Sequence, residues 1–521
     1  MATSYDAVFI GAGHNTLAAA LHLSVRGWSV GVFEQGAVAG GAVKTGDYTV
    51  AGFRHDWAAM NLSLFAGSTF FETHGPELMQ HGLEFVPVSN SFATVFPDHT
   101  WCGVSTDLAA TTARIATHCA ADAATWNRLM ADFPNEAPHL FGLLDSPMKM
   151  RALAFWTIKF LRAKGLGGTL DMGQFLLQSP RQWLTQTFES PHVQAMLGAW
   201  GLHLDFAPDI TGGAIFPYIQ AMASQAHGMV LGKGGADTII RAMVATIETH
   251  GGSAETDAAV TRILHANGKA HGIELADGRT ITATRAVIAG VAPRALPLLT
   301  GTSSAFDAKM TAYTYAPGTM MIHLALRDLP DWNAGHEVQS FAYVHIAPSL
   351  DQMARTYQQA VAGLLPDEPI VVVGQPTTVD PTRAPAGQHA IWLQVRMAPG
   401  TITGDAGGEI TSTDWAQAGE PFASRVLDIF ESHAPGTRAK ILGQRVVTPL
   451  ELEQDNPNLV GGDQVCGSHH MSQHYLFRPA RGHADGSTPI KNLHLTGAAV
   501  WPGAGTGAGS GFLLARSLVG K

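Results

Sequence analysis

The chain has 521 residues, of which 46% are hydrophobic and 14% charged, and its formal net charge is −10 at pH 7. A chain of this length is long enough to form two or more domains with large hydrophobic cores. The negative net charge argues against a nucleic-acid partner. No apolar stretch is long enough to cross a bilayer, and the first strand begins too early to leave room for a signal peptide. We therefore expect a cytoplasmic protein.

A nucleotide-binding pattern occupies the first forty-one residues. The apolar run 5–10 predicts a strand, and it ends directly in a glycine turn at 11–13. Small and apolar residues at 17–23 then predict a helix, and the run 28–33 predicts a second strand that closes at Glu34. This order of strand, turn, helix, strand and acid is typical of a domain that binds an ADP-bearing cofactor.

Each residue of this pattern has a physical role. Gly11 permits the tight turn, and Gly13 lets the N–H groups at the helix N-terminus approach a pyrophosphate. Glu34 stands where a carboxylate would accept both ribose hydroxyls. Thr16 replaces the third glycine of the fingerprint, so the helix and the strand must pack around a larger side chain.

Two further glycine-rich segments indicate that the cofactor is FAD. Gly40 and Gly41 follow the ribose acid and predict a second close approach of the backbone, as FAD requires in its extended form. Near the C-terminus, a strand at 492–496 leads into a glycine-rich loop and an apolar helix at 512–518. We expect this loop to aim another set of backbone amides and a helix dipole at the cofactor.

The middle of the chain predicts a second domain. Segment 66–225 is rich in helix-like patterns and predicts an inserted helical subdomain, and 301–440 alternates strands with a helix near 415–433. We assign both segments to a substrate domain built from a sheet and helices. The FAD-binding domain is then discontinuous and comprises residues 1–65, 226–300 and 441–521.

The motifs at both ends of the chain carry a family resemblance. GAGHNTLAAALHL at 11–23, the two glycines at 40–41 and TGAAVWPGAGTGAGSG at 496–511 resemble the phytoene desaturase-type flavoproteins. The nearer match is the branch called pyridine nucleotide-disulphide oxidoreductase domain-containing protein 2. The resemblance implies an α/β protein with a Rossmann-type FAD-binding domain of the glutathione reductase and amine oxidase kind. It also implies FAD that is bound without a covalent link.

The resemblance also implies which residues contact the cofactor. Val260 would meet adenine through its backbone. The other residues fall into three groups along the cofactor: Gly11, Gly13, His14, Asn15, Glu34 and Gln35 at the ADP moiety; Gly40, Gly41 and Lys44 along the pyrophosphate and ribityl chain; and Gly497, Trp501, Pro502, Gly505, Thr506 and Gly507 over the isoalloxazine. Trp501 stands where relatives often have a smaller or polar residue, so it bears on substrate specificity.

The sequence predicts one dinucleotide site. A domain for NAD(P)H would need a second strand–turn–helix–strand–acid unit, and the sequence has none. Electrons should therefore flow from an organic substrate to the flavin and then to oxygen or a quinone. The three cysteines (Cys102, Cys119 and Cys466) form no CxxC pair, which argues against disulfide reductase chemistry.

The catalytic residues are harder to predict. His55 and Asp56 follow the flavin motifs, and either could act as a base, although both could equally satisfy backbone amides in a buried loop. Trp57, His203 and Trp501 are candidates for lining the substrate cavity. We expect no metal, because the spacing of His469, His470 and His474 occurs without a carboxylate ligand nearby.

Segment 147–164 has five basic residues and no acidic one. Aromatic and aliphatic residues alternate with the cations, which suits a helix lying on anionic lipid. The alternatives are a helix that packs on its own domain, or a contact between subunits of a homo-oligomer.

Together these features predict an FAD-dependent oxidoreductase that dehydrogenates (desaturates) or isomerises a hydrophobic small molecule. The alternative within enzymes is a flavin amine or amino-acid oxidase. A second alternative is a protein that binds FAD and lipid without catalysis.

Overall fold

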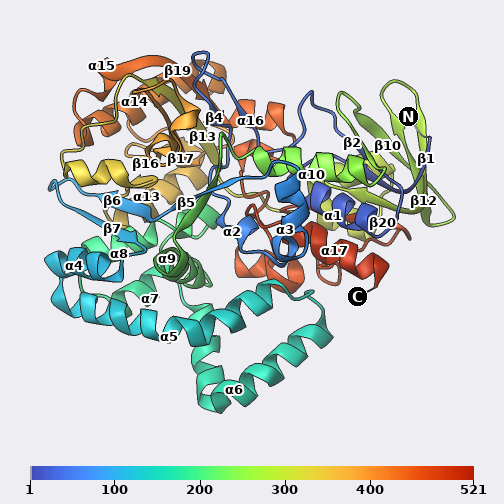
Figure 1. Ribbon diagram of the computed structural model, residues 1–521, viewed down its shortest axis with the longest axis horizontal. Coiled ribbons are helices and arrows are strands. Elements are labelled where there is room, and N and C mark those ends of the chain that lie inside the picture. The colour runs from blue at the N-terminus through green and yellow to red at the C-terminus, as the bar shows by residue number, and fades with distance from the viewer. Residues whose placement is uncertain (1–2, 521) are drawn as a thin grey trace.

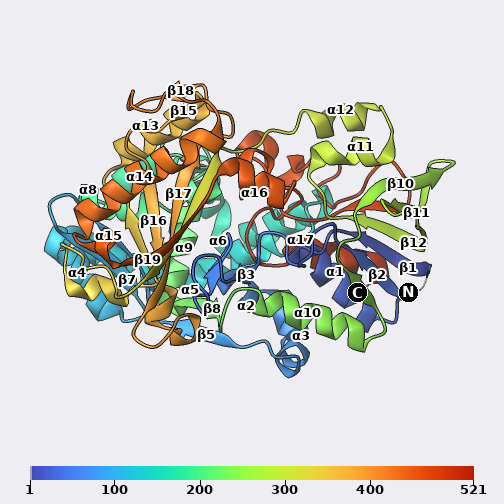
Figure 2. The ribbon, with the colours of Figure 1, turned by 90° about the horizontal axis from the view of Figure 1, so that it is seen from above.

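The computed structural model describes residues 3–520 and contains two large sheets, each of seven strands. Figure 1 shows one sheet on the right, beside both chain termini, and the other on the left, and Figure 2 shows the same division from above. The chain passes between the two halves several times, so each is built from discontinuous segments. The α/β class is as predicted.

The first sheet is built around two parallel strands from the N-terminus. β1 pairs in parallel with β2 on one side and with β12 on the other, so the carboxyl ends of these three strands lie at one edge. In an open α/β sheet this edge is the usual ligand-binding edge. The strand order is β10 (Val260–Ala266), β11 (Lys269–Leu275), β12 (Thr280–Ala289), β1 (Ser4–Ile10), β2 (Val30–Phe33) and β9 (Ser253–Glu255), with β20 (Leu493–Leu495) beside β12.

Three helices from distant parts of the sequence pack together at this sheet: α1 (His14–Val25), α10 (Thr238–Thr249) and α17 (Gly509–Val519). Glycines allow the close packing. A Cβ on Gly511 would lie 1.7 Å from the carbonyl oxygen of Asn15, so α17 can approach α1 only with glycine there. A Cβ on Gly290 would lie 2.2 Å from Oγ1 of Thr16. The larger residue in the fingerprint is thus accommodated by a glycine just beyond β12.

The second sheet is antiparallel except where β14 and β6 run in parallel. Its strand order is β19 (Ile441–Val447), β13 (Gly318–Leu326), β17 (His389–Ala398), β16 (Ile370–Gly374), β14 (Tyr343–Ile346), β6 (Asn90–Val95) and β7 (Trp101–Ser105). Helix α14 (Trp415–His433) has the predicted bounds and buries aromatic and aliphatic residues in the core of this half.

The structure differs from the predicted segments in two places. Segment 66–225 is not only helical, because it contributes β6 and β7 to the second sheet. β19 was expected in the flavin domain, but it pairs with β13 of the second sheet. β6 and β7 form a hairpin with each other, but β6 joins the second sheet through β14 and β19 joins it through β13. These two partners lie far away in the sequence, so the pairings leave no local signal.

The remaining elements are mostly helices, some of which lie at the first sheet and others at the second. The longer ones are α3 (Thr69–Gln80), α4 (Leu108–His118), α5 (Ala120–Leu144), α6 (Met150–Leu177), α7 (Pro180–Thr187), α8 (Pro191–Gly198), α9 (Ile215–His227) and α13 (Leu350–Val361). The short ones are α2 (Ser63–Ala66), α11 (Leu296–Thr300), α12 (Ala305–Thr311), α15 (Thr437–Lys440) and α16 (Pro449–Asp455). Short strands pair as β3 (Thr45–Gly46) with β4 (His55–Asp56), β5 (Phe85–Val88) with β8 (Met229–Gly232), and β15 (Leu364–Leu365) with β18 (Gly404–Asp405). Within residues 3–520, no helix is both long enough and apolar enough to span a bilayer.

Buried histidines make the stability of the protein depend on pH. Burial lowers the pKa of His22, His55 and His74 to about 4, and Nδ1 of His22 lies 2.9 Å from Nε2 of His74. Their ordinary pKa is 6.5, so below that pH the unfolded chain takes up protons that the folded chain does not. The stability these groups confer is complete above about pH 6.5 and is lost as the pH falls toward 4.

We therefore expect the free energy of unfolding to fall between about pH 7.5 and pH 5, by on the order of 1–2 kcal/mol for each of these histidines. Urea unfolding of the holoprotein at several pH values measures this. A variant with His22→Asn and His74→Asn should have a shallower pH dependence. A pH-independent stability over this range in the wild-type protein would contradict the assignment.

Candidate functional site

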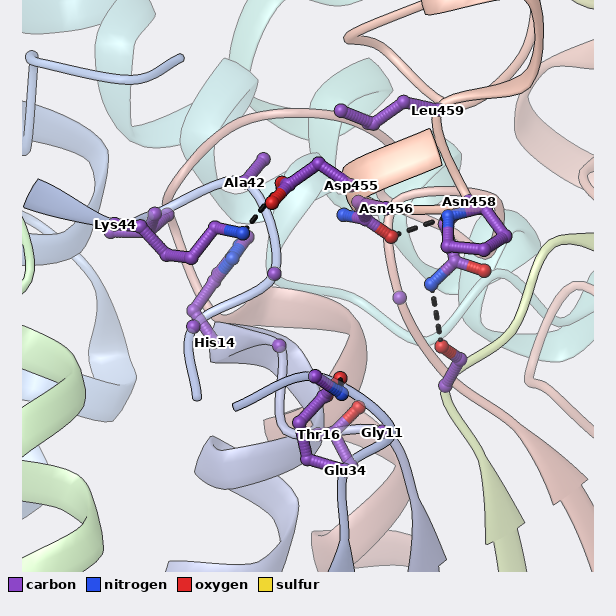
Figure 3. A pocket seen from close by; sticks show the side chains of 18 of the residues that line it. Gly11, His14, Thr16, Glu34, Ala42, Lys44, Asp455, Asn456, Asn458 and Leu459 are labelled. Atoms are coloured by element: carbon purple, nitrogen blue, oxygen red, sulfur yellow. Dashed lines mark hydrogen bonds and ion pairs between the residues drawn. The ribbon is translucent and has the colours of Figure 1, made fainter. Parts of the chain in front are cut away.

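A single cavity of about 890 Å³ follows the carboxyl-end edge of the first sheet and extends toward the second. Its wall combines segments from both ends and the middle of the chain, and Figure 3 shows part of it. Predicted cofactor residues in the wall are Gly11, Gly13, His14, Asn15, Glu34, Gln35, Gly40, Gly41, Lys44, Val260, Gly497, Gly505 and Thr506. The predicted cofactor segments thus share one cavity, although they are up to 495 residues apart.

The N-terminus of α1 opens into this cavity. Gly13 is the N-cap residue, no described side chain caps the helix, and the first turn contains no acidic residue. A Cβ on Gly13 would meet nothing within 4 Å, whereas Gly11 has φ +86°, which favours glycine. The N–H groups of the first turn are therefore available to an anion, and the helix dipole favours negative charge there.

Glu34 lies at the end of β2 in the cavity wall. One carboxylate oxygen accepts the N–H of Ala12 at 2.7 Å, and the other accepts the N–H of Gly36 at 2.9 Å. Each oxygen retains a second lone pair, so the carboxylate is oriented and can still accept a pair of hydroxyl groups. Val260, which begins β10, lines the cavity as well.

Lys44 occupies the middle of the cavity wall, but it is paired. Its Nζ lies 2.5 Å from Oδ2 of Asp455, at the end of α16. Beside this carboxylate, Asn458 accepts the N–H of Ala292 at 2.6 Å and donates to the carbonyl oxygen of Gly290 at 2.9 Å. No cofactor motif in the sequence points to this polar turn, Asp455-Asn-Pro-Asn458; its turn-forming composition is the only local signal.

The C-terminal glycine-rich loop is fixed on both sides. Nε2 of His14 lies 3.0 Å from the carbonyl oxygen of Gly505, and Thr506 donates its hydroxyl to the carbonyl oxygen of Asn61 at 3.0 Å. On the other side, Nε2 of His469 accepts the N–H of Ala504 at 3.0 Å. Burial holds the pKa of His469 well below its usual value, which keeps the ring neutral. The protein itself thus supplies hydrogen bonds that hold the loop in place.

Three predicted residues of this loop lie outside the cavity wall: Trp501, Pro502 and Gly507. The indole of Trp501 is 2% exposed, packs with Leu143 and Met148, and donates to the carbonyl oxygen of Ser146 at 3.0 Å. The indole of Trp501 thus does not reach the wall of this cavity, and its role toward a substrate stays a prediction. The loop turns the indole toward the junction of α5 and α6 instead.

His55 and Asp56 are also outside the cavity wall. Asp56 is buried, and its carboxylate accepts from Nη1 of Arg383 at 2.5 Å, from the Thr45 hydroxyl at 2.7 Å and from the N–H of Ala236 at 2.7 Å. His55 is buried as well, with Nε2 at 2.8 Å from the hydroxyl of Thr49. The geometry favours the structural alternative, in which His55 and Asp56 satisfy buried polar groups.

His203 is likewise not in the wall, and Nε2 of this ring lies 3.2 Å from Nε2 of His345. Its pKa is lowered well below the usual value, chiefly by burial, which keeps the ring neutral. His203 is thus outside the cavity that the cofactor motifs share, and its contact with a substrate stays a prediction. In the part of the chain that the structure describes, no three His, Cys, Asp or Glu side chains could jointly hold a metal ion.

Trp57 does line the cavity, and it does so together with Tyr48. Their rings lie 4.9 Å apart at 63°, and Nζ of Lys44 is 5.9 Å from the centre of the Trp57 ring. Behind them is the buried ring of His323, stacked on Trp57 at 5.9 Å. The sequence did not point to Tyr48 or His323, because a single aromatic residue forms no recognisable motif.

Comparison with known proteins agrees with this geometry. A profile of the family described as flavin containing amine oxidoreductase matches residues 17–309, which is more than half of the chain. The chain belongs to this family. It is therefore an FAD-dependent oxidoreductase, of the phytoene desaturase-type group that its sequence motifs indicated.

Two curated relatives are similar along much of the chain. Pyridine nucleotide-disulfide oxidoreductase domain-containing protein 2 of Rattus norvegicus is 27% identical over 546 residues, covering 97% of this chain and 92% of the relative. A lycopene-forming phytoene desaturase of a Paracoccus strain is 26% identical over 350 residues, covering 64% of this chain and 66% of the relative.

Solved structures share the fold. An oxidoreductase from Methanosarcina mazei aligns with a TM-score of 0.62 at 18% identity, covering 99% of this chain and 100% of the other. A putrescine oxidase variant aligns with a TM-score of 0.61 at 13% identity, covering 99% of this chain and 97% of the other.

The residues of the cavity fit FAD. The uncapped N-terminus of α1 suits the pyrophosphate, and the oriented carboxylate of Glu34 suits the adenosine ribose. From there the wall continues past Lys44 to Gly505 and Thr506, as an extended cofactor requires. When bound, FAD supplies the electron acceptor for substrate oxidation. The chain supplies the orientation of the cofactor and the walls that exclude water.

Proposed function

We propose that this enzyme dehydrogenates (desaturates) or isomerises a hydrophobic small molecule and that the electrons pass on to oxygen or a quinone. The observation that carries this proposal is the wall around Tyr48 and Trp57, which also includes Ala59 and Leu459. Lys44 and Asp455 of this wall neutralise one another, and Arg445, which is also in the wall, pairs with Glu451. An apolar substrate would meet few unpaired charges there.

Two ionisable groups of the cavity wall, Tyr48 and Cys466, are unsuited to act as a base. Burial raises the pKa of the Tyr48 phenol above its ordinary value and raises that of the Cys466 thiol to about 12. Both groups therefore stay protonated near neutral pH and are poor bases and poor nucleophiles. A protonated Cys466 also supports FAD that is held without a covalent link, which heat or acid would release intact.

An amine or amino-acid oxidase is the second candidate. The inclined Tyr48 and Trp57 rings at the cavity favour it, because aromatic faces attract cations. The solved structure of putrescine oxidase shares the fold. A third candidate is a protein that binds FAD and lipid without turnover.

Anaerobic flavin absorbance separates these candidates. The holoenzyme is mixed with a panel of polyenes, including phytoene, and with a panel of amines that includes putrescine. Bleaching by polyenes alone supports the proposal, whereas bleaching by amines alone replaces it with the oxidase. Admitting oxygen or a quinone to the bleached enzyme then identifies the acceptor. If neither panel bleaches the flavin, mass spectrometry of small molecules that copurify with the protein extends the panels, and failure of those compounds too supports the non-catalytic candidate.

We also expect NADH and NADPH to reduce the flavin slowly or not at all without oxygen. The chain has one glycine fingerprint followed by a ribose acid, and its only such pattern lies in the FAD cavity. Anaerobic titration followed by flavin absorbance tests this, with dithionite as the positive control for complete reduction. Rapid stoichiometric bleaching by either nucleotide would contradict the single-site interpretation.

A further inference from the structure

Helix α6 extends away from both sheets and bends sharply (Figure 1). The bend is at Gly165, whose φ of +70° and ψ of −177° interrupt the helix and divide it into two arms. All residues of α6 are described, and Phe160 alone is buried. The rest of the chain holds α6 mainly near its two ends, through Leu153 and Trp156 on the first arm and Met172, Phe175 and Leu176 on the second. The middle of the helix has little buried surface.

One side of the first arm holds α6 to α5. The indole N–H of Trp156 donates to the carbonyl oxygen of His139 at 3.0 Å. Phe160 stacks on Trp156 at 5.3 Å and meets the edge of His139 at 5.0 Å. Trp156 and Phe160 therefore face α5. The opposite side of the first arm has no partner among the described residues.

The opposite side is apolar and exposed. On the first arm, Phe155 is 70% exposed, and Ile158 and Leu161 follow it at helical spacing. On the second arm, Leu166 and Leu170 are 69% and 65% exposed. Neighbouring exposed apolar side chains on a projecting element mark a surface that is covered in use.

Cations surround these apolar residues. Arg151, Lys159, Arg162 and Lys164 are all exposed, and no acidic residue occurs from 146 to 170. The fifth cation of the segment, Lys149, instead pairs with Asp485 at 3.0 Å. The local charge of α6 is thus positive on a chain whose net charge is −10.

We propose that α6 is an interfacial helix that docks on an anionic lipid surface. The exposed apolar side chains enter the acyl region, and the four unpaired cations lie among the headgroups. The opposite charge of surface and helix favours this occupant over a second copy of the chain, because two α6 helices would bring eight cations together. This inference goes beyond the proposed reaction and does not depend on it.

The base of α6 lies close to the wall of the FAD cavity. Trp501 packs with Leu143 and Met148, where α5 leads to α6, and it donates to the carbonyl oxygen of Ser146. Gly505, four residues further along the same loop, lines the cavity. A membrane bound by α6 would therefore hold the cavity near the bilayer, where hydrophobic compounds partition.

Co-sedimentation with vesicles tests the proposal on the full-length holoprotein. We expect binding to vesicles of phosphatidylcholine with phosphatidylglycerol, little binding to phosphatidylcholine alone, and loss of binding at high salt. Changing Arg151, Lys159, Arg162 and Lys164 together to Gln should weaken the binding on the order of 1000-fold. The matched control changes four exposed cations elsewhere, Lys269, Lys309, Arg327 and Lys491, to Gln. This control variant has the same net charge as the α6 cation variant and should retain most of the vesicle binding.

A second variant, with Phe155, Leu166 and Leu170 changed to Ser, tests the apolar contribution and should also release the protein from the vesicles. FAD absorbance verifies that each variant is folded. Equal loss in the α6 cation variant and its control would overturn the proposal, as would failure of the wild-type protein to bind at low salt. Self-association on a sizing column that the Ser variant abolishes would assign the surface to a second copy instead.

Discussion

Replacing Arg383 with Met should lower the free energy of unfolding by about 3–5 kcal/mol. The guanidinium is fully buried and contacts the carboxylate of Asp56 at 2.5 Å and that of Asp380 at 3.1 Å. It also donates to the carbonyl oxygen of Gly232 at 2.7 Å. Because Met provides no charge and no donor, both carboxylates would remain buried without their cation.

Urea unfolding of the holoprotein measures this effect. The matched control is Arg279→Met, since Arg279 also bridges two carboxylates, Glu255 and Asp277, but does so on the surface. Exposed pairs contribute little to stability, so this variant should unfold close to wild type. Similar losses for the two variants would contradict the assignment of Arg383 as a buried structural cation.

A substitution of Asp56, the partner of Arg383, tests whether this carboxylate is structural or catalytic. If its carboxylate only balances Arg383, Asp56→Asn should reduce stability while the rate of flavin reduction by substrate stays near that of wild type. A fall in that rate of about 100-fold or more, with stability preserved, would restore Asp56 as a base.

Replacing Glu34 with Ala should weaken FAD binding by about 1–3 kcal/mol, or on the order of 10- to 100-fold in Kd. The carboxylate orients the turn through Ala12 and Gly36 and faces the cavity where the ribose is expected. Its loss removes a hydrogen-bond acceptor from both the turn and the cofactor.

Fluorescence titration of the apoprotein with FAD gives the Kd. Asp455→Asn is the matched control, because Asp455 is another carboxylate of the same cavity but is engaged by Lys44. We expect the control to bind FAD more tightly than Glu34→Ala does. An unchanged Kd in Glu34→Ala would mean that Glu34 is not the ribose ligand.

The sequence by itself determined the features that arise from local backbone chemistry. The strand, glycine turn, helix and acid of the first forty-one residues were readable because each depends on neighbouring residues. Gly11 needs a positive φ, α1 needs small residues, and α14 needs a long amphipathic run. Such requirements are met within one or two turns of chain, so they leave a pattern in the sequence.

Only the tertiary structure decided which residues far apart in the sequence meet. It paired Asp56 with Arg383, brought Asp455 to Lys44, placed Tyr48 beside Trp57 and turned Trp501 away from the cavity. None of these contacts produces a local pattern, because each depends on how two separate segments pack. The sequence predicted correctly that α6 is a helix rich in cations, but only the packing of Trp156 and Phe160 on α5 revealed which side is left exposed. Which side of α6 is buried depends on the partner helix α5. The helical period of the sequence alone does not specify which face of a helix will be buried.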